Sequence, residues 1–348
     1  MFNPISTQEK LDFIKNLAVM LKSGIPINDA LASLEEQARS KKFRSIIVDM
    51  RVNIEKGIPL KDAFEGQRRI FGPIFISLVG AGEASGTLEE NLLFLADLLE
   101  RSEALKNEIN ATLLYPKIVI TATLLLGGGL SVFILPRLVP LFKSLRLTLP
   151  FATRALLGFS IFVQEQWLWI LIGLGVLIAA FITANRMHAS RRILDKLYLR
   201  LPFFGTMLIE YELALVAQVF STLLKSGMSL NESLDIVSET ATNISYKEAL
   251  LGCKERVLKG TTLAEALKEY SYYFLPSFIT LVAVGEKSGT LETSFVTLSE
   301  FYEKEVRNKT KRLPNIIEPS LLIFIGLTVG FVALAIILPI YQITRGIR

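Results

Sequence analysis

The sequence predicts an all-α membrane protein with two tandem cytosolic six-helix bundles, each followed by a transmembrane helix, and one additional return span. Two observations predict this class, a tandem repeat at a fixed spacing and three long apolar stretches. Hydrophobic residues make up 51% of the 348 residues. The mean hydropathy of +0.44 is high for a soluble chain of this length.

The repeat is clearest in one motif, GEASGTLE at residues 82–89, which returns as GEKSGTLE at residues 285–292. The two copies lie 203 residues apart (285 − 82 = 203). The same spacing aligns residues 21–24 with 224–227, 56–57 with 259–260, Phe71, Pro73, Phe75 and Ile76 with Phe274, Pro276, Phe278 and Ile279, Pro116 with Pro319, and Pro136 with Pro339. A spacing that survives this many turns without an insertion predicts two copies of one folded unit.

The first copy, residues 1–114, is predicted to be a bundle of short amphipathic helices. Apolar residues recur at helical spacing in three runs, which are Leu11, Ile14, Leu17, Ala18 and Leu21, then Ala30, Leu31 and Leu34, then Ile46, Ile47, Met50 and Ile54. Glycine and proline at residues 24–26 and 56–59 mark turns after the first and third runs. Further helices are expected at about residues 60–64, 74–84 and 88–114. The prediction is therefore six helices per copy.

Three apolar stretches, at residues 118–135, 167–184 and about 316–340, qualify as membrane spans. They hold 18, 18 and 25 residues (340 − 316 + 1 = 25), which as helices is about 27 to 37 Å. The predicted order is a first bundle (1–114), a first transmembrane helix (115–140), a short external loop (141–165), a second transmembrane helix (166–185), a second bundle (186–315), a third transmembrane helix (316–341) and an external tail (342–348).

The repeat also predicts the topology. Both bundles are hydrophilic outside and share one fold, so we expect them on the same side of the membrane. The stretch at 167–184 has no counterpart in the other repeat, which makes it the return span. The first twenty residues hold no uninterrupted apolar run that would predict a signal peptide, so the N-terminus and both bundles are expected in the cytosol. Basic residues after the second span support this orientation, although the external loop is also basic.

The composition argues against several kinds of chemistry. Cys253 and His188 are the single cysteine and histidine, too few for an intrachain disulfide, a His/Cys metal site or a Cys/His nucleophilic pair. No phosphate-binding loop of the G-x-x-x-x-G-K-[ST] type occurs. We therefore expect no enzyme activity, no catalytic residues, no cofactor and no metal. The pI near 9.1 is explained by basic residues next to the membrane, so direct nucleic-acid binding is not predicted.

The duplicated motif supplies the candidate site. Its residues are Gly82, Glu83, Ser85, Gly86, Thr87, Leu88 and Glu89 in the first copy and Gly285, Glu286, Ser288, Gly289, Thr290, Leu291 and Glu292 in the second. Glycine allows a positive φ and threonine a helix cap, with capping-box spacing from Thr87 to Glu90 in the first copy only. Turn geometry does not require Glu83 and Glu286. Each carboxylate either accepts backbone hydrogen bonds or pairs with a base inside its bundle, or it contacts a partner.

A second group of candidates lies at the span boundaries. Pro116 follows Tyr115 at the entrance of the first span, and Pro319 follows Glu318 at the entrance of the third. Prolines at such positions set the start or a kink of a helix. A carboxylate at headgroup level is easily solvated, so an anchoring or kink-stabilising role is expected for Glu318.

The duplicated motifs resemble the type II secretion system F domain family. They are the opening LKSG-x-x-x-x-x-[AS]-L (21–31 and 224–234), the step KG-x-x-L-x-x-A (56–63 and 259–266), the F-x-P-x-F-I segment followed by GE-x-SGTL, the pairs Tyr115-Pro116 and Glu318-Pro319, and LPIY at 338–341. The resemblance covers nearly the whole chain. It implies a non-enzymatic platform protein of the bacterial inner membrane, in type II secretion, type IV pilus or competence pseudopilus systems.

The resemblance also implies partners. These are a cytosolic hexameric assembly ATPase, pilin or pseudopilin subunits and other inner-membrane assembly components. The quasi-symmetric pair of bundles further suggests a homo-oligomer. The alternative is a small membrane transporter built from internal repeats. Against it, the spans are few, the repeats are parallel and no charged residue lies deep within a span. A scaffold that works without a motor is a third option.

Overall fold

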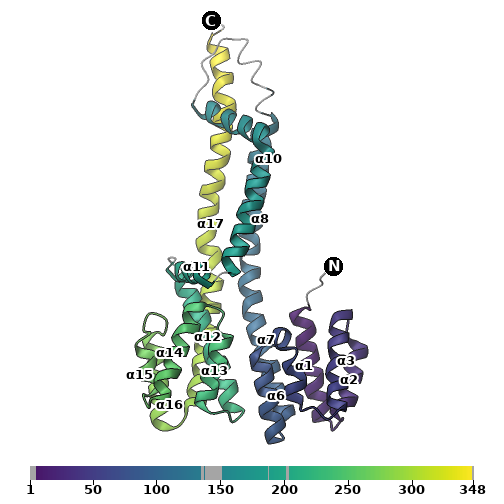
Figure 1. Ribbon diagram of the computed structural model, residues 1–348. Coiled ribbons are helices and arrows are strands. Elements are labelled where there is room, and N and C mark those ends of the chain that lie inside the picture. The colour runs from purple at the N-terminus through teal and green to yellow at the C-terminus, as the bar shows by residue number, and fades with distance from the viewer. Residues whose placement is uncertain (1–4, 135–136, 138–150, 187, 201–203, 347–348) are drawn as a thin grey trace. The chain divides into compact units, whose positions relative to one another are not determined.

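The computed structural model describes residues 5–134, 137, 151–186, 188–200 and 204–346 (Figure 1). All regular elements in these residues are helices, which confirms the predicted all-α class. Pro136 and residues 141–150 of the predicted loop lie outside the described residues. The chain forms two compact units, one of residues 1–107 with 192–308 and the other of 108–191 with 309–348.

The first bundle belongs to the first unit and holds seven helices. They are α1 (Thr7–Lys22), α2 (Ile27–Gln37), α3 (Lys41–Glu55), α4 (Leu60–Glu65), α5 (Arg68–Phe71), α6 (Pro73–Ser85) and α7 (Leu88–Thr112). Six of them match the predicted helices, and α5 is an additional single turn. The predicted number of six therefore does not describe this bundle.

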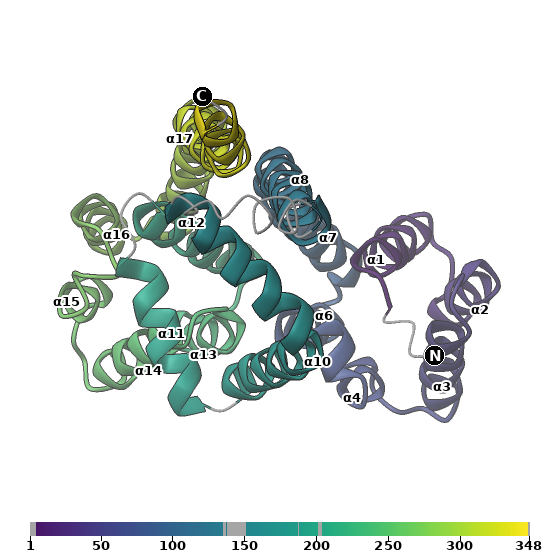
Figure 2. The same ribbon diagram turned by 90° about the horizontal axis from the view of Figure 1, so that it is seen from above.

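The second bundle follows the same plan. Its helices are α12 (Phe204–Lys225), α13 (Leu230–Thr240), α14 (Ile244–Leu258), α15 (Leu263–Lys268), α16 (Pro276–Ser288) and α17 (Leu291–Gly346). From α13 to α17, each helix starts 203 residues after its counterpart (230 − 27, 244 − 41, 263 − 60, 276 − 73 and 291 − 88). In Figure 2 the helices α12 to α16 gather in one group and α1 to α6 in another. The helix α11 (His188–Arg200) precedes the second bundle.

Apolar side chains at the predicted spacing fill both bundles. The buried residues of α1 are Leu11, Phe13, Ile14, Leu17 and Ala18, which includes four of the five predicted there. Aromatic rings pack at the centres, with stacked pairs 4.5 Å apart at Phe71–Phe75 and at Phe220–Phe295. Side-chain caps define several helix starts. For example, Ser229 and Glu232 form a capping box at the start of α13.

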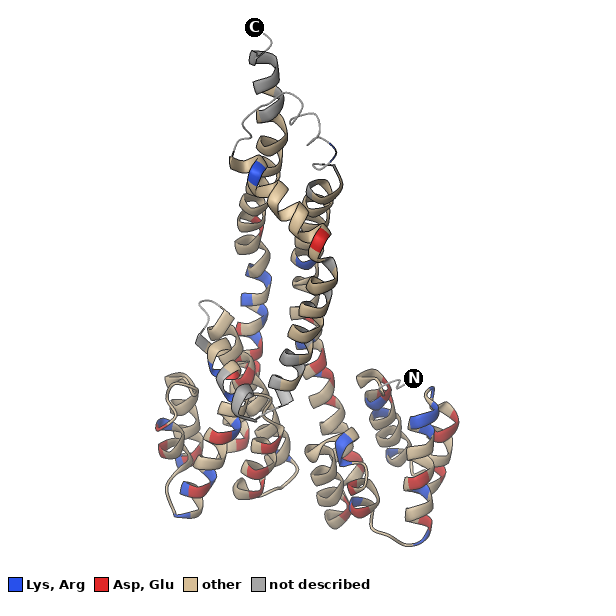
Figure 3. Ribbon diagram, turned by 45° about the horizontal axis from the view of Figure 1, so that its top comes forward, with Lys and Arg blue, Asp and Glu red and all other residues tan. Residues whose placement is uncertain are grey.

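The second unit holds long apolar helices. They are α8 (Leu114–Gly129), a π-helical turn η1 (Leu130–Ile134), α10 (Phe151–Arg186) and the later part of α17. Figure 3 shows these helices mainly without charged residues, whereas the bundle helices carry both signs of charge. Residues 151–165, predicted to lie in a loop, are helical in α10, because the apolar periodicity extends before Trp167.

Three helical stretches are long and apolar enough to cross a membrane. They are Leu88–Gly129, Phe204–Lys225 and Leu291–Leu338. The first contains residues 118–129 of the span predicted at 118–135, and the third contains residues 316–338 of the span predicted at about 316–340. Most side chains of Phe204–Lys225 are buried, so the hydropathy of α12 reflects its place in the bundle core. The predicted return span falls on a helix pair, Phe151–Gln166 and Leu168–Leu177, bent by 80°. The chain is a multi-pass membrane protein.

Candidate functional site

The duplicated glutamates bind the start of a neighbouring helix. Glu83 on α6 accepts hydrogen bonds from Leu60 N at 2.7 Å and Lys61 N at 3.1 Å. Glu286 on α16 does the same for α15, with Leu263 N at 2.6 Å and Ala264 N at 3.1 Å. The first N–H groups of a helix have no hydrogen-bond partner within the helix, and each carboxylate accepts from two of them. Its negative charge is also stabilised by the positive end of the helix dipole. In each bundle this geometry is that of a carboxylate that accepts backbone hydrogen bonds.

The two helix starts differ in their other caps. Pro59 precedes α4 and provides no side-chain cap. At the equivalent position before α15, the Thr262 hydroxyl also accepts from Glu265 N at 3.2 Å. The start of α4 therefore depends more on Glu83 than the start of α15 depends on Glu286.

The glycines of the motif have two separate roles. Gly86 and Gly289 adopt φ of 74° and 70°, as the prediction of a positive φ requires. Gly82 and Gly285 are helical and permit a close helix crossing. A Cβ on Gly82 would lie 2.7 Å from Leu88 Cα, and one on Gly285 would lie 2.8 Å from Ser294 Cβ. This second role was not predicted from the sequence.

The hydroxyl groups of the motif bond to each other rather than to the next helix. Ser85 Oγ donates to Ala81 O at 2.7 Å and lies 2.7 Å from Thr87 Oγ1. In the second copy, Ser288 Oγ lies 2.6 Å from Thr290 Oγ1. The predicted threonine cap is not among the hydrogen bonds of the described residues. The hydroxyl pair occupies the threonine side chain and closes the turn instead.

The remaining motif residues begin the following helix. Leu88 and Leu291 are its first residues, and Glu89 and Glu292 lie in its first turn. A carboxylate there is favoured by the helix dipole. The duplicated motif is thus a complete junction between two helices, which also holds the start of a third.

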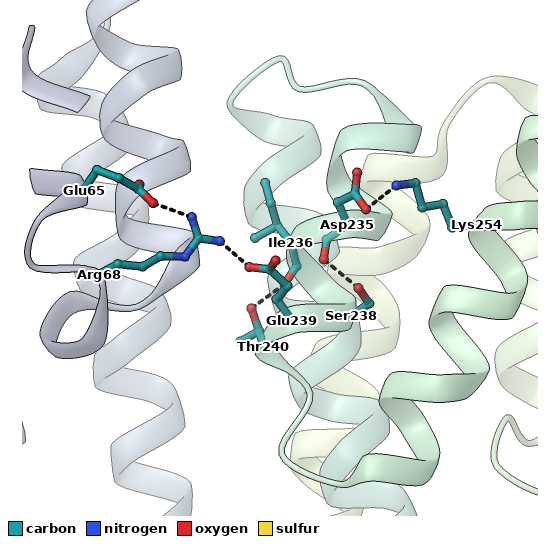
Figure 4. Close-up of polar contacts among 8 residues, drawn as sticks. All are labelled: Glu65, Arg68, Asp235, Ile236, Ser238, Glu239, Thr240 and Lys254. Atoms are coloured by element: carbon teal, nitrogen blue, oxygen red, sulfur yellow. Dashed lines mark hydrogen bonds and ion pairs between the residues drawn. The ribbon is translucent and has the colours of Figure 1, made fainter. Parts of the chain in front are cut away.

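A cluster of charged residues joins the bundles within the first unit (Figure 4). Arg68 donates from Nη1 to Glu65 Oε1 at 2.8 Å and from Nη2 to Glu239 Oε2 at 2.5 Å. Arg68 comes from α5, the helix that the sequence did not predict, and Glu239 comes from α13. The hydrogen bond that Arg68 donates to Glu65, followed by the one that it donates to Glu239, raises the pKa of Arg68.

Glu212 on α12 is a buried carboxylate that sequence analysis also missed. It is 5% exposed, its Oε1 accepts from the Thr242 hydroxyl, and its Oε2 has no hydrogen-bond partner in the part of the chain that is described. It borders a cavity of about 320 Å³ that is also lined by α7 and α13. Burial raises the pKa of Glu212 to about 7, with a smaller opposing effect of the Thr242 hydrogen bond. Its counterpart in the repeat is Glu9 (212 − 203 = 9), which was the available signal.

The span-boundary residues fall in different settings. Pro116 lies in the first turn of α8, just after an interruption at Leu113. Pro319 and Glu318 lie inside α17, which continues without interruption from Leu291 to Gly346. Pro319 therefore ends no helix. An anchoring role for Glu318 stays a prediction.

Cys253 lies in the core of the second bundle, on α14. Burial raises the pKa of its thiol to about 12, so the group stays protonated. No group of three or more His, Cys, Asp or Glu side chains with the arrangement of a metal site occurs among the residues that the structure describes.

Comparison with known proteins adds two findings. The sequence pattern of the family described as "Type II secretion system (T2SS), protein F" matches residues 13–136 and again residues 216–339. Both ends of the match shift by the repeat spacing (216 − 13 = 203; 339 − 136 = 203). The two matches together cover 248 of the 348 residues (2 × 124 = 248).

Individual relatives align over almost the whole chain. The "Type IV pilus assembly protein PilC" of Thermus thermophilus is 33% identical over 331 residues, which cover 95% of this chain and 81% of the relative. The "Type II secretion system protein F" of Xanthomonas campestris is 29% identical over 348 residues, covering 99% and 85%. The "Type IV pilus assembly protein PilC" of Myxococcus xanthus is 26% identical, covering 100% and 83%.

Proposed function

The chain belongs to the type II secretion system protein F family, and from this we propose that it couples a cytosolic assembly ATPase to the assembly of pilin or pseudopilin subunits. The observation that carries the proposal is the double family match, which spans both bundles and the apolar helices that follow them. The relatives named above are assembly proteins of the type IV pilus and a component of type II secretion.

Two properties of the described residues support this role. The bundle helices carry many charged residues of both signs (Figure 3), which suits contact with a soluble motor. The later part of α17 and α8 carry exposed apolar side chains such as Leu125, Leu126 and Leu327. Such side chains suit contact with lipid or with the apolar helix of a membrane-embedded subunit. The proposed platform is a homo-oligomer that contacts these partners and further inner-membrane assembly components.

The coupling is testable in proteoliposomes that contain the purified chain and its cognate assembly ATPase. We expect no ATP hydrolysis by the chain alone and a higher rate for the ATPase when the chain is present. A heat-denatured sample of the chain is the control. An ATPase rate that is unaffected by the folded chain would contradict the coupling.

The proposed orientation places the N-terminus and both bundles in the cytosol of a bacterial cell, next to the inner membrane. Single cysteines test it in a Cys253→Ala background, with Asn110→Cys and Lys311→Cys beside the bundles and Ser144→Cys in the predicted external loop. An impermeant maleimide applied to intact spheroplasts should label the variant at 144 and spare the other two. Labelling at 110 or 311 that matches labelling at 144 would overturn the orientation.

A further inference from the structure

The cavity beside Glu212 has a counterpart in the first bundle. That counterpart is a pocket of about 210 Å³, and the cavity in the second bundle holds about 320 Å³. Residues that lie 203 positions apart line both, among them Glu9 and Glu212, Phe13 and Val216, and Ala38 and Ala241. Each bundle therefore forms a pocket at the same place, with a glutamate in its wall.

The two pockets differ in the rest of the wall. Three polar residues that line the first pocket, Asp12, Asn16 and Arg39, correspond to Leu215, Val219 and Thr242 in the second. Helix α7 adds Leu98 and Leu99 to the wall of the second pocket. The same glutamate thus lies in a polar wall in the first bundle and in a mainly apolar wall in the second.

The charges around Glu212 favour a cation. The other charged residues of its wall, Glu103 and Lys106, pair with each other, with Lys106 Nζ 3.6 Å from Glu103 Oε2. Among charged neighbours, Asp195 has the largest effect on Glu212, and it is also a carboxylate. Thr242 donates to Oε1, whereas Oε2 has no hydrogen-bond partner within the described part of the chain. A carboxylate buried among apolar groups is stabilised most by a donor that carries a positive charge.

We propose that this cavity binds a small organic amine with a compact apolar body, whose ammonium group donates to the Glu212 carboxylate. The apolar body packs against side chains such as Leu98, Leu215 and Val219. The hydroxyl groups of Ser102 and Tyr211, which also line the cavity, can accept the remaining N–H groups of the ammonium. An apolar cavity of about 150 Å³ holds a benzene molecule, so this larger one has room for an aromatic ring with a short aminoalkyl chain.

Amine binding goes beyond the proposed coupling and does not depend on it. The measurements below use the purified full chain without ATPase or pilin. Their failure would remove the amine site and leave the coupling untouched, whereas failure of the proteoliposome experiment would leave the amine site untouched.

The first test is isothermal titration calorimetry of the full chain in nanodiscs at pH 8, with the heat of empty nanodiscs subtracted. The probes are 2-phenylethylamine and 2-phenylethanol, which have the same body and differ in charge. The amine should bind at one site per chain, about tenfold or more tighter than the alcohol. Glu212→Gln should remove this preference, and Glu9→Gln in the equivalent pocket should leave it unchanged. Equal affinity for both probes, or amine binding that survives Glu212→Gln, would overturn the proposal.

The second test is the pH dependence of the amine affinity. Burial raises the pKa of Glu212 to about 7, so a proton competes with the ammonium group for the carboxylate. An alkylammonium group itself stays charged up to pH 8. The amine affinity should therefore rise about tenfold from pH 6 to pH 8, while the alcohol affinity stays constant.

Other titratable and charged groups surround Glu212, namely Asp195 on α11, Tyr211 on α12, Tyr246 on α14, and Glu103 and Lys106 on α7. Glu212→Gln separates their effects from that of Glu212. The amine affinity of this variant should not change with pH. A tenfold rise that persists in Glu212→Gln would contradict the proposal.

The third test fills the cavity without changing its charge. Leu215→Trp on α12 and Ser102→Phe on α7 should each abolish binding of both probes, because a large ring takes the place of the ligand. Asp12→Trp, at the position equivalent to Leu215 in the first bundle, is the control and should leave binding unchanged. Slow thiol labelling of buried Cys253 shows that a variant is folded. Amine binding that survives in a folded cavity-filling variant would place the amine elsewhere and overturn the proposal.

Discussion

The two bundles have the same order of helices but differ in which side chains their neighbours bury. The equivalent residues Glu9 and Glu212 show this difference. Glu9 accepts hydrogen bonds from Arg39 N at 3.1 Å and Ser40 N at 2.9 Å, and it remains partly exposed. Glu212 receives backbone hydrogen bonds at the equivalent turn but is almost fully buried beside α7. Both repeats thus keep a glutamate that accepts hydrogen bonds at this turn. Its burial differs because helix α7 lies beside Glu212 of the second bundle, whereas Glu9 of the first bundle stays partly exposed.

The largest expected difference between the bundles is a pH dependence between pH 5 and 8 that arises from Glu212 in the second one. The pKa of Glu212 is raised from 4.5 to about 7, so the folded state binds its proton more tightly than the unfolded state. The resulting stabilisation is complete below pH 4.5 and is lost as the pH rises through 7. Between pH 5 and 8 the free energy of unfolding should fall by up to about 3 kcal/mol. The charged and titratable groups around Glu212 include Asp195, Tyr211, Tyr246, Glu103 and Lys106.

Circular dichroism at 222 nm during heating of the full chain measures this effect. Glu212→Gln should flatten the pH dependence and stabilise the protein at pH 8, because the neutral amide still accepts a hydrogen bond. Glu9→Gln is the matched control and should leave the pH dependence unchanged. If the wild-type chain and Glu212→Gln lost stability equally between pH 5 and 8, another group would be responsible.

The next effect concerns the close crossing of α6 and α7. Gly82→Ala should destabilise the first bundle by about 1 to 3 kcal/mol, because the new methyl group meets the backbone of Leu88. Gly80→Ala on the same helix is the control. Its methyl group would meet the flexible Lys61 side chain at 2.8 Å, so the higher helix propensity of alanine should make this change nearly neutral.

A thiol reporter measures the opening of each bundle separately. Cys253 reports on the second bundle, and Met50, its fully buried counterpart (253 − 203 = 50), offers the equivalent place in the first. The double variant with Cys253→Ala and Met50→Cys carries its single thiol at position 50. A thiol-reactive dye should then label Gly82→Ala at a lower temperature than Gly80→Ala. If the labelling curves of Gly82→Ala and Gly80→Ala were identical, the close crossing of α6 and α7 would not explain why residue 82 is a glycine.

A smaller difference is expected between the two capping glutamates. Glu83→Ala should cost about 1 to 2 kcal/mol, since it leaves two N–H groups of α4 without a partner. Glu286→Ala should cost less, because Thr262 still caps α15. Membrane abundance and thermal stability, measured beside pilus or secretion output for both single variants and the double variant, check this. Output lost from a variant of normal abundance and stability would instead assign the turns to a partner contact.

The smallest effect is expected at the charged cluster. Arg68→Ala and Glu239→Ala should each cost at most about 0.5 kcal/mol, because the pair is exposed and screened by salt. A double-mutant cycle in 0.05 and 0.5 M salt, read from thermal unfolding, isolates the pair. A coupling energy well above 1 kcal/mol that resists salt would show that the pair is a main determinant of the contact between the bundles.

Sequence reasoning succeeded where a local rule acts and failed where the contact is tertiary. Helical periodicity predicted the buried face of α1, and the repeat spacing predicted the helix starts of the second bundle. The close approach at Gly82 and the burial of Glu212 depend on a second helix whose position no local pattern gives. Arg68 belongs to a single helical turn that is too short for a periodic signal. Glu83 was recognised as unexplained by turn geometry, yet only the fold identifies the N–H groups that it binds.

The π-helical turn η1 ends the equivalence of the two repeats. The counterpart of residues 130–134 is 333–337, which is regular α-helix in α17. A π-turn holds one more residue than an α-turn, and each residue of an α-helix rotates it by about 100°. Across Leu130–Ile134 the helix is therefore turned about its own axis by up to roughly that angle relative to its counterpart. Phe133 is accordingly exposed where its counterpart Ile336 is half-buried. Two residues that align in the repeat, Phe133 and Ile336, thus differ in exposure. The direction in which a helix points its side chains can change even though the two sequences align without an insertion.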